Sequence, residues 1–127
     1  MKNAINWFEL PAKNFKRAVK FYETVMGIKI DIMPNDPKMP PMKYGMFPFD
    51  MEDGGIGGGI VEAKGSEPSQ KGSLIYLNGG DDLSKPLAKV KKAGGKVVMP
   101  KTSIGPNGFM GVFVDTEGNK VAFHSRK

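Results

Sequence analysis

The sequence contains no cysteine, only one histidine and one tryptophan, and no long apolar run. Without cysteine, disulfides and thiolate chemistry are excluded. A single histidine and no nucleophile elbow leave no basis for a Ser-His-Asp triad. The apolar runs are too short to cross a membrane. The first residues lack the apolar region of a signal peptide, so we expect a cytoplasmic protein.

Arginine is also scarce, although the chain is basic, with a formal net charge of +6. Of the 19 basic residues only Arg17 and Arg126 are arginines, and the lysines are spread along the chain. Base readout and bidentate phosphate binding favour arginine, and no basic run alternates with aromatic residues. We therefore expect a solvated lysine-rich surface and no nucleic-acid partner.

What the sequence does contain is an internal repeat. The spacing of five positions is repeated 68 residues later. Phe15, Ala18, Val19, Tyr22 and Gly27 correspond to Leu83, Pro86, Leu87, Val90 and Gly95. In both copies an apolar strand precedes the helical pattern and another follows the glycine. Such a repeat predicts two similar modules packed against each other, each too small to close a core alone. We predict a single domain, 1–127, with modules 1–62 and 72–127 joined by the polar linker 63–71.

The order of the predicted elements is βαβββ, twice, which is an α+β fold. In the first module, Asn14 is the predicted helix N-cap and Gly27 the stop. In the second, Asp81 or Asp82 caps the helix. The predicted strands are 5–10, 28–33, 44–49 and one containing 60–61, then 73–78, 96–101, 109–114 and 120–125.

Two segments are unusual in composition. Residues 54–59 contain five glycines, a nearly bare backbone that a ligand or another strand can approach closely. The loop 34–43 contains four prolines, and methionines cluster in and around it. Methionine provides adaptable apolar surface, which suits either a lid over a cleft or a subunit interface. The sequence does not choose between the two.

With this order established, the chain resembles the vicinal oxygen chelate superfamily, which includes glyoxalase I, bleomycin-resistance proteins and extradiol dioxygenases. The resemblance is carried by Asn6–Pro11, Ala18–Gly27, Asp81–Leu83, Ala93–Val97 and the turn Asp115–Asn119. It implies that the two modules build an incomplete barrel around an internal cleft. It also implies a homodimer, for which the glycine-rich strand and the Pro/Met loop offer suitable surface.

The resemblance further implies a divalent metal in some members, held by His and Glu from the first and fourth strands of each module. The matching positions here are Trp7, Leu74 or Ile75, Ala122, and one residue within Gly57–Ile60. None of these side chains binds metals, whereas a divalent site needs three or four N or O donors. We therefore expect no resident metal and no other cofactor.

Alternation along the strands gives the candidate site. Trp7 and Glu9 share one face of the first strand, and Ala122 and His124 share one face of the last. The remaining candidate ligand-binding residues are Tyr76, Asn78, Phe109 and Met110, and Phe47 is a further candidate for a cleft wall. Glu9 and His124 lie two residues from the implied metal positions. If they converge, they are candidates for a catalytic base and acid.

Three functional hypotheses follow. The first is a metal-free module that binds a small, partly apolar molecule in the cleft. The second is a glyoxalase-like lyase or isomerase, or a dioxygenase, with an atypical divalent-metal site. The third is a structural or regulatory protein whose own side chains fill the cleft. The ligand is not identified by the sequence.

Overall fold

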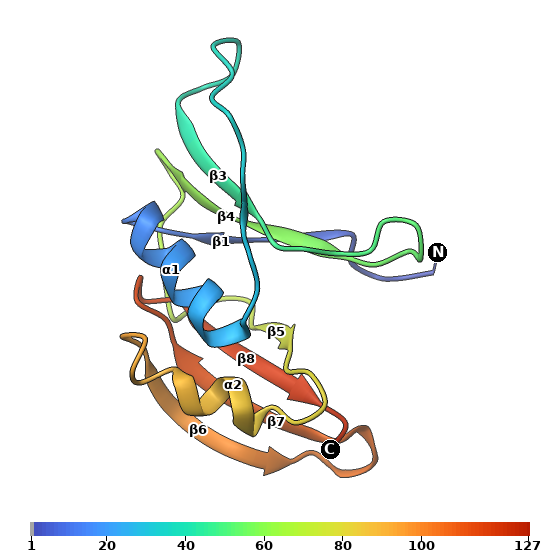
Figure 1. Cartoon of the computed structure of the whole chain (residues 1–127). Coiled ribbons are helices and arrows are strands. Elements are labelled where there is room, and N and C mark those ends of the chain that lie inside the picture. Colours follow the sequence, from blue (N-terminus) through green and yellow to red (C-terminus); the bar gives the residue numbers. More distant parts are fainter. Residues whose placement is uncertain (1) are drawn as a thin grey trace.

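The computed structural model describes residues 2–127, so the first residue of the predicted first module lies outside it. The fold is α+β and consists of two βαβββ-like modules, each built around a four-stranded mixed sheet (Figure 1). The first module contains β1 (Trp7–Pro11), α1 (Phe15–Met26), β2 (Asp31–Ile32), β3 (Met42–Met46) and β4 (Gly57–Ala63). The second contains β5 (Ile75–Asn78), α2 (Ser84–Lys89), β6 (Lys96–Ser103), the 3-10 turn η1 (Gly105–Asn107), β7 (Phe109–Val114) and β8 (Lys120–Ser125).

The predicted repeat is confirmed by the order of strands. Sheet one has the order β1-β4-β3-β2, and sheet two has the corresponding order β5-β8-β7-β6. In each sheet the first and last strands of the module are parallel and the other pairs are antiparallel. Among the described residues no ladder joins the two sheets, so the predicted incomplete barrel is not closed.

Helix α1 begins and ends where the sequence predicts. The Asn14 side chain accepts a hydrogen bond from the Arg17 backbone N–H at 3.1 Å. Gly27 ends the helix in the left-handed conformation, with φ of 64°, which glycine adopts without steric cost. The predicted apolar stripe is buried: Phe15, Ala18, Val19, Tyr22 and Val25.

Several boundaries differ from the prediction for identifiable reasons. Strand β2 is shorter than 28–33 because the Ile30 backbone N–H donates to the Glu23 carboxylate and not to a neighbouring strand. Strand β3 begins two residues earlier and ends three residues earlier than predicted, before Pro48, which has no N–H to donate. Asp82 does not cap α2 formally. The N-cap residue is Leu83, and the Asp82 carboxylate, one residue earlier, accepts from the N–H of Ser84, the first residue of α2, at 3.0 Å.

The core is shared between the two modules. Tyr22 of α1 packs edge-on against Phe47 of the first module, and its ring also lies 6.4 Å from that of Phe113 in the second. Phe113 in turn packs against Phe123 at 4.9 Å. All four rings are buried. Because one cluster contains side chains from both halves, neither sheet buries its apolar face alone.

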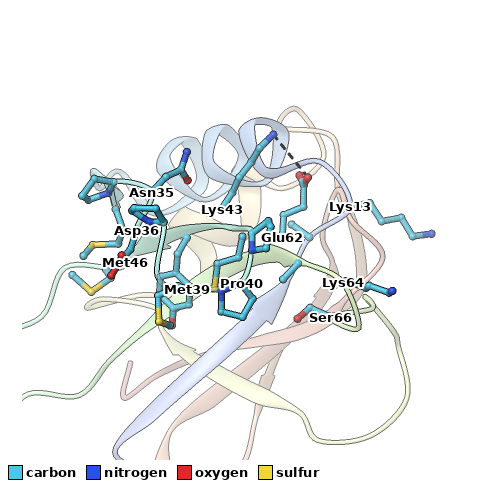
Figure 2. Close-up of a pocket in the computed structure, with 18 of the residues that line it drawn as sticks. Lys13, Asn35, Asp36, Met39, Pro40, Lys43, Met46, Glu62, Lys64 and Ser66 are labelled. Atoms are coloured by element: carbon cyan, nitrogen blue, oxygen red, sulfur yellow. Dashed lines mark ion pairs between the residues drawn. The ribbon is translucent and has the colours of Figure 1, made fainter.

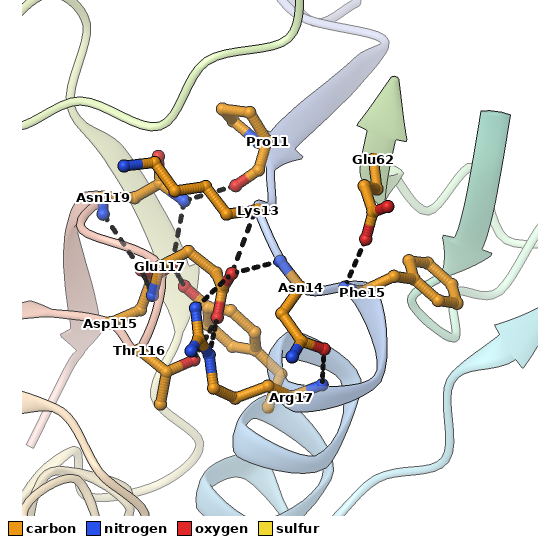
Figure 3. A network of polar contacts seen from close by, with 11 residues as sticks. Pro11, Lys13, Asn14, Phe15, Arg17, Glu62, Asp115, Thr116, Glu117 and Asn119 are labelled. Carbon is orange, nitrogen blue, oxygen red and sulfur yellow. Dashed lines mark hydrogen bonds and ion pairs between the residues drawn. The ribbon is translucent and has the colours of Figure 1, made fainter. Parts of the chain in front are cut away.

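A buried carboxylate also holds the modules together, at the start of α1 (Figure 3). Glu117, in the turn between β7 and β8, accepts hydrogen bonds from the backbone N–H groups of Lys13 and Asn14 at 2.9 and 2.7 Å. It also pairs with Arg17, at 2.7 Å from Nε. Burial raises the pKa of Glu117, but the bonds from Arg17, Asn14 and Thr116 outweigh it, and the net pKa is lowered.

The same turn makes two further contacts with the first module. The Asn119 amide donates to the Pro11 carbonyl at 2.7 Å. The buried Tyr22 hydroxyl donates to Asp115 at 2.6 Å, and burial together with this carboxylate raises the pKa of Tyr22 well above its ordinary value. The turn Asp115–Asn119 therefore connects the two modules through hydrogen bonds and an ion pair.

No helix in the described part of the chain is long and apolar enough to cross a membrane.

We predict that Glu117→Gln lowers the free energy of unfolding at neutral pH by about 2–3 kcal/mol, because a hydrogen-bonded buried charge is lost and Arg17 loses its partner. Since the folded-state pKa of Glu117 is lowered, its contribution is present above the ordinary Glu pKa of about 4.3. That contribution is lost as the pH falls through the folded-state value. The variant should therefore lose less stability on acidification than the wild type.

Urea unfolding at neutral pH and at a series of acidic pH values measures both effects. The exposed Glu52→Gln is the matched control and should behave as the wild type. Equal acid sensitivity of Glu117→Gln and the wild type would show that this carboxylate does not couple folding to protonation.

Candidate functional site

The candidate site lies on the face of sheet one opposite the core. Strand register pairs Trp7 with Gly57, and Glu9 with Gly59 and then Met46. Residues paired across strands lie on the same face, and side chains alternate along each strand. Trp7, Glu9, Tyr44 and Met46 therefore share this face, while Phe8 and Leu10 point toward the core.

Aromatic rings pack directly against the glycines of β4. A methyl group added at Gly57 would overlap the ring of Phe49, and one at Gly59 would overlap the ring and hydroxyl of Tyr44. On the other face, Gly58 lies against the ring of Phe8. The close approach that the sequence predicts at these glycines is thus made by the chain's own aromatic side chains.

Three aromatic side chains and one carboxylate are thereby brought together. The Trp7 indole Nε1 donates a hydrogen bond of 2.7 Å to the Tyr44 hydroxyl. Trp7 and Phe49 meet edge to face, with ring centroids 5.4 Å apart and planes at 81°. Burial raises the pKa of Tyr44, the hydrogen bond from Trp7 lowers it, and the Glu9 carboxylate raises it, with a net increase. Trp7, Tyr44 and Phe49 are half-buried and Glu9 is exposed.

The candidates from the second module lie on the corresponding face of sheet two. His124 pairs with Asn78 on one side and with Met110 on the other, and the Tyr76 hydroxyl lies 3.9 Å from the Met110 sulfur. Alternation places Phe109 on the opposite face of the sheet, packed against the core.

The polar members of this group have local partners. The Asn78 side chain accepts from the Gly80 N–H at 2.9 Å. The His124 Nε2 lies 2.7 Å from the Asn107 carbonyl. Because a carbonyl only accepts, Nε2 is the donor in this contact, and in the neutral ring Nδ1 is then the acceptor. Within residues 2–127 no hydrogen bond or ion pair links His124 to Trp7 or Glu9.

A cavity of about 1220 Å³ is lined by Tyr44, Met46 and residues of the Pro/Met loop 34–43 (Figure 2). Four methionines and four prolines line it: Met33, Met39, Met42, Met46, Pro34, Pro37, Pro40 and Pro41. The charged residues of its lining are three lysines and three acidic residues, so their formal charges cancel. Lys43 and Glu62 among them form an ion pair at 3.9 Å. Tyr44 and Met46 connect this cavity with the face that carries Trp7 and Glu9.

A second cavity, of about 490 Å³, lies between the modules on their core side and includes Phe8, Leu77 and Lys85. Trp7 and Glu9 line neither of these two cavities. Glu9 is exposed and Trp7 half-buried, on the face that also carries Tyr44 and Met46 of the larger cavity.

Sequence reasoning missed Tyr44 and Phe49, and it named Phe47 as a candidate wall. Phe47 is buried and packs against Phe8 and Tyr22 in the core. The available signal was the run of glycines in β4, because bare strand positions are often covered by aromatic side chains from neighbouring strands.

The residues present do not fit a divalent metal of the kind that the family resemblance implies. At the implied ligand positions, the Trp7 indole is a hydrogen-bond donor only, Ala122 has no polar side-chain atom, and the glycines of β4 have no side chain. Among the described residues, no group of three His, Cys, Asp or Glu side chains could hold a metal ion.

Comparison with known proteins identifies the family. The model of the Glyoxalase/Bleomycin resistance protein/Dioxygenase superfamily matches residues 4–123. Because the match covers nearly the whole chain, this glyoxalase-like chain belongs to that superfamily, which is the resemblance predicted from the sequence. A glyoxylase-like domain-containing protein from Didymella fabae is 35% identical over 127 residues, covering 96% of this chain and 93% of that protein.

Solved structures show the same fold at low sequence identity. A glyoxalase/bleomycin resistance protein from Albidiferax ferrireducens T118 has a TM-score of 0.70 at 15% identity, covering 98% of this chain and all of that one. A glyoxalase I variant from Zea mays has a TM-score of 0.74 at 23% identity, covering 95% of this chain. This chain spans only 46% of the maize protein.

We predict that divalent ions do not stabilise this protein, because its donor set is too small. Nickel, zinc or manganese should leave the melting temperature unchanged, and a chelator should change neither the melting temperature nor ligand binding. Thermal unfolding with and without each ion is the measurement. Stabilisation by an ion that persists in His124→Ala would reveal a metal site that does not use His124.

Proposed function

We propose that this glyoxalase-like protein binds a small, partly apolar molecule on the Trp7–Glu9 face of sheet one, without a resident metal. The observation that carries the proposal is the Trp7–Tyr44 hydrogen bond of 2.7 Å beside the exposed Glu9 carboxylate. An aromatic surface with a few oriented polar groups is the usual composition of a small-ligand site.

The ion pairing of the described residues supports this proposal. The chain has 19 basic residues, yet the ion pairs of the described residues, Arg17–Glu117, Lys43–Glu62 and Lys101–Asp82, do not involve Glu9. A carboxylate exposed beside three aromatic rings is thus available to accept hydrogen bonds from a ligand. The adjoining Met/Pro cavity offers apolar contact for the rest of such a molecule.

The proposal includes the corresponding face of sheet two. Tyr76 and Asn78 lie on the face of β5 that points away from the core, as Trp7 and Glu9 do on β1. Tyr76, Asn78, Met110 and His124 would form the second wall of the site. If the ligand is also a substrate, Glu9 and the Nδ1 of His124 are the groups available for proton transfer.

Trp7 is the only tryptophan, so quenching of its fluorescence reports binding in a screen of small metabolites. For a ligand identified in this way, Glu9→Gln should weaken binding by about 1–3 kcal/mol, the value of a hydrogen bond to a charged group. The melting temperature should change little, because Glu9 is exposed. Asp81→Asn, an exposed acidic residue of the second module, is the matched control. Unchanged affinity with a lowered melting temperature would assign Glu9 to the scaffold instead.

We further propose that the protein is a homodimer in which a second copy covers part of the open face. The chain exposes 8434 Å², whereas a compact folded monomer of 13.8 kDa exposes about 6,600 Å². The excess includes apolar side chains of the Pro/Met loop: Met33 is 40% exposed and Met39 is 51% exposed.

Light scattering should therefore give a mass of twice 13.8 kDa at micromolar protein concentration. A double variant, Met33→Glu with Met39→Glu, should shift the mass toward that of the monomer, because charge in an apolar interface is unfavourable. A wild-type protein that is monomeric at high micromolar concentration would contradict the proposal.

A further inference from the structure

We infer that the Trp7–Glu9 site is selective for an organic cation, such as an alkylated ammonium group. This inference rests on the proposed function and adds the chemical class of the ligand. It follows from two properties of one face of sheet one: the sign of its charges and the arrangement of its aromatic rings.

The charges on this face are all acidic. The cross-strand row that contains Glu9 runs through Gly59 and Met46 to Asp31 on the edge strand. By register and alternation, Glu9 and Asp31 are the only charged residues that β1, β2, β3 and β4 place on this face. Lys43 and Glu62 point to the other face and pair with each other. In a chain with a net charge of +6, these strand positions thus carry two acidic residues and no lysine.

The rings are held so that cation–π contact is available. Trp7 and Phe49 stand at 81° to each other with centroids 5.4 Å apart, and the hydrogen bond to Tyr44 fixes the indole. All three rings are half-buried, so each retains an exposed part. A cation over such faces is attracted by the ring quadrupoles, most strongly by tryptophan.

The carboxylate favours a cation over the alternatives. The negative charge of ionised Glu9 repels an anionic ligand, and a neutral ligand lacks the Coulombic attraction that a cation gains beside this carboxylate. An ammonium group satisfies the carboxylate and the rings together. The Met/Pro cavity that begins at Tyr44 and Met46 can take an alkyl or aromatic substituent on that cation.

The test uses three probes of nearly equal shape: choline, its neutral isostere 3,3-dimethyl-1-butanol, and the anion 3,3-dimethylbutyrate. Binding is measured by quenching of Trp7 and by calorimetry. We expect choline to bind at least about threefold more tightly than the neutral isostere, the ratio that a cation–π contribution supplies, and the anion to bind most weakly.

Variants assign the selectivity to residues. Glu9→Gln and Phe49→Leu should each reduce the ratio of choline to isostere affinity toward one, while Asp81→Asn should leave it unchanged. Circular dichroism and thermal unfolding establish that each variant is folded. If Phe49→Leu is not, the ratio in Glu9→Gln alone decides the inference.

Two results would overturn the inference. Equal or tighter binding of the neutral isostere in the wild type would remove the cation selectivity but leave the proposed small-molecule site in place. Tighter binding of choline that is unchanged in Glu9→Gln would show that the cation binds elsewhere on the chain. The proposed function itself fails only if no compound in the metabolite screen quenches Trp7.

Discussion

The structure depends on one carboxylate, that of Glu117, at the start of helix α1. The first backbone N–H groups of a helix have no partner within the helix, and a negative charge at that end is favourable. Glu117, which belongs to the second module, accepts hydrogen bonds from the backbone N–H groups of Lys13 and Asn14. Glu62, in β4 of the first module, accepts from the Phe15 N–H at 2.7 Å. Because the two carboxylates come from different modules, capping this helix also joins the two halves of the chain.

The contacts made by the turn Asp115–Asn119 also position the strand that carries the candidate site. Strand β1, which carries Trp7 and Glu9, ends at Pro11, and the Pro11 carbonyl is held by Asn119. The next residues, from Lys13 onward, are held by Glu117. The strand is also fixed laterally, because β4 pairs with it along all five of its residues. A side chain on β1 is therefore positioned by contacts with both modules.

The sequence was sufficient to predict the repeat, the helix limits at Asn14 and Gly27, and the shared face of Trp7 and Glu9, since each depends on local spacing. It was not sufficient for Tyr44, whose role depends on a ring reaching over Gly59 of a neighbouring strand. Nor was it sufficient for Glu117, which local spacing shows only as part of a turn. Contacts between residues about a hundred positions apart leave no periodic signal in the sequence. The run of glycines predicted that some group approaches the backbone closely, but not which group.

The replacement of one implied metal-ligand position changes the character of sheet one. The family resemblance expects a histidine at position 7, where a tryptophan stands. Its indole N–H cannot coordinate a metal, and it donates to the Tyr44 hydroxyl instead. Gly57 and Gly59 of β4 then provide the space that the Phe49 and Tyr44 rings occupy. The aromatic surface around Trp7 therefore depends on the glycines of β4, because each ring occupies room that a larger β4 side chain would fill.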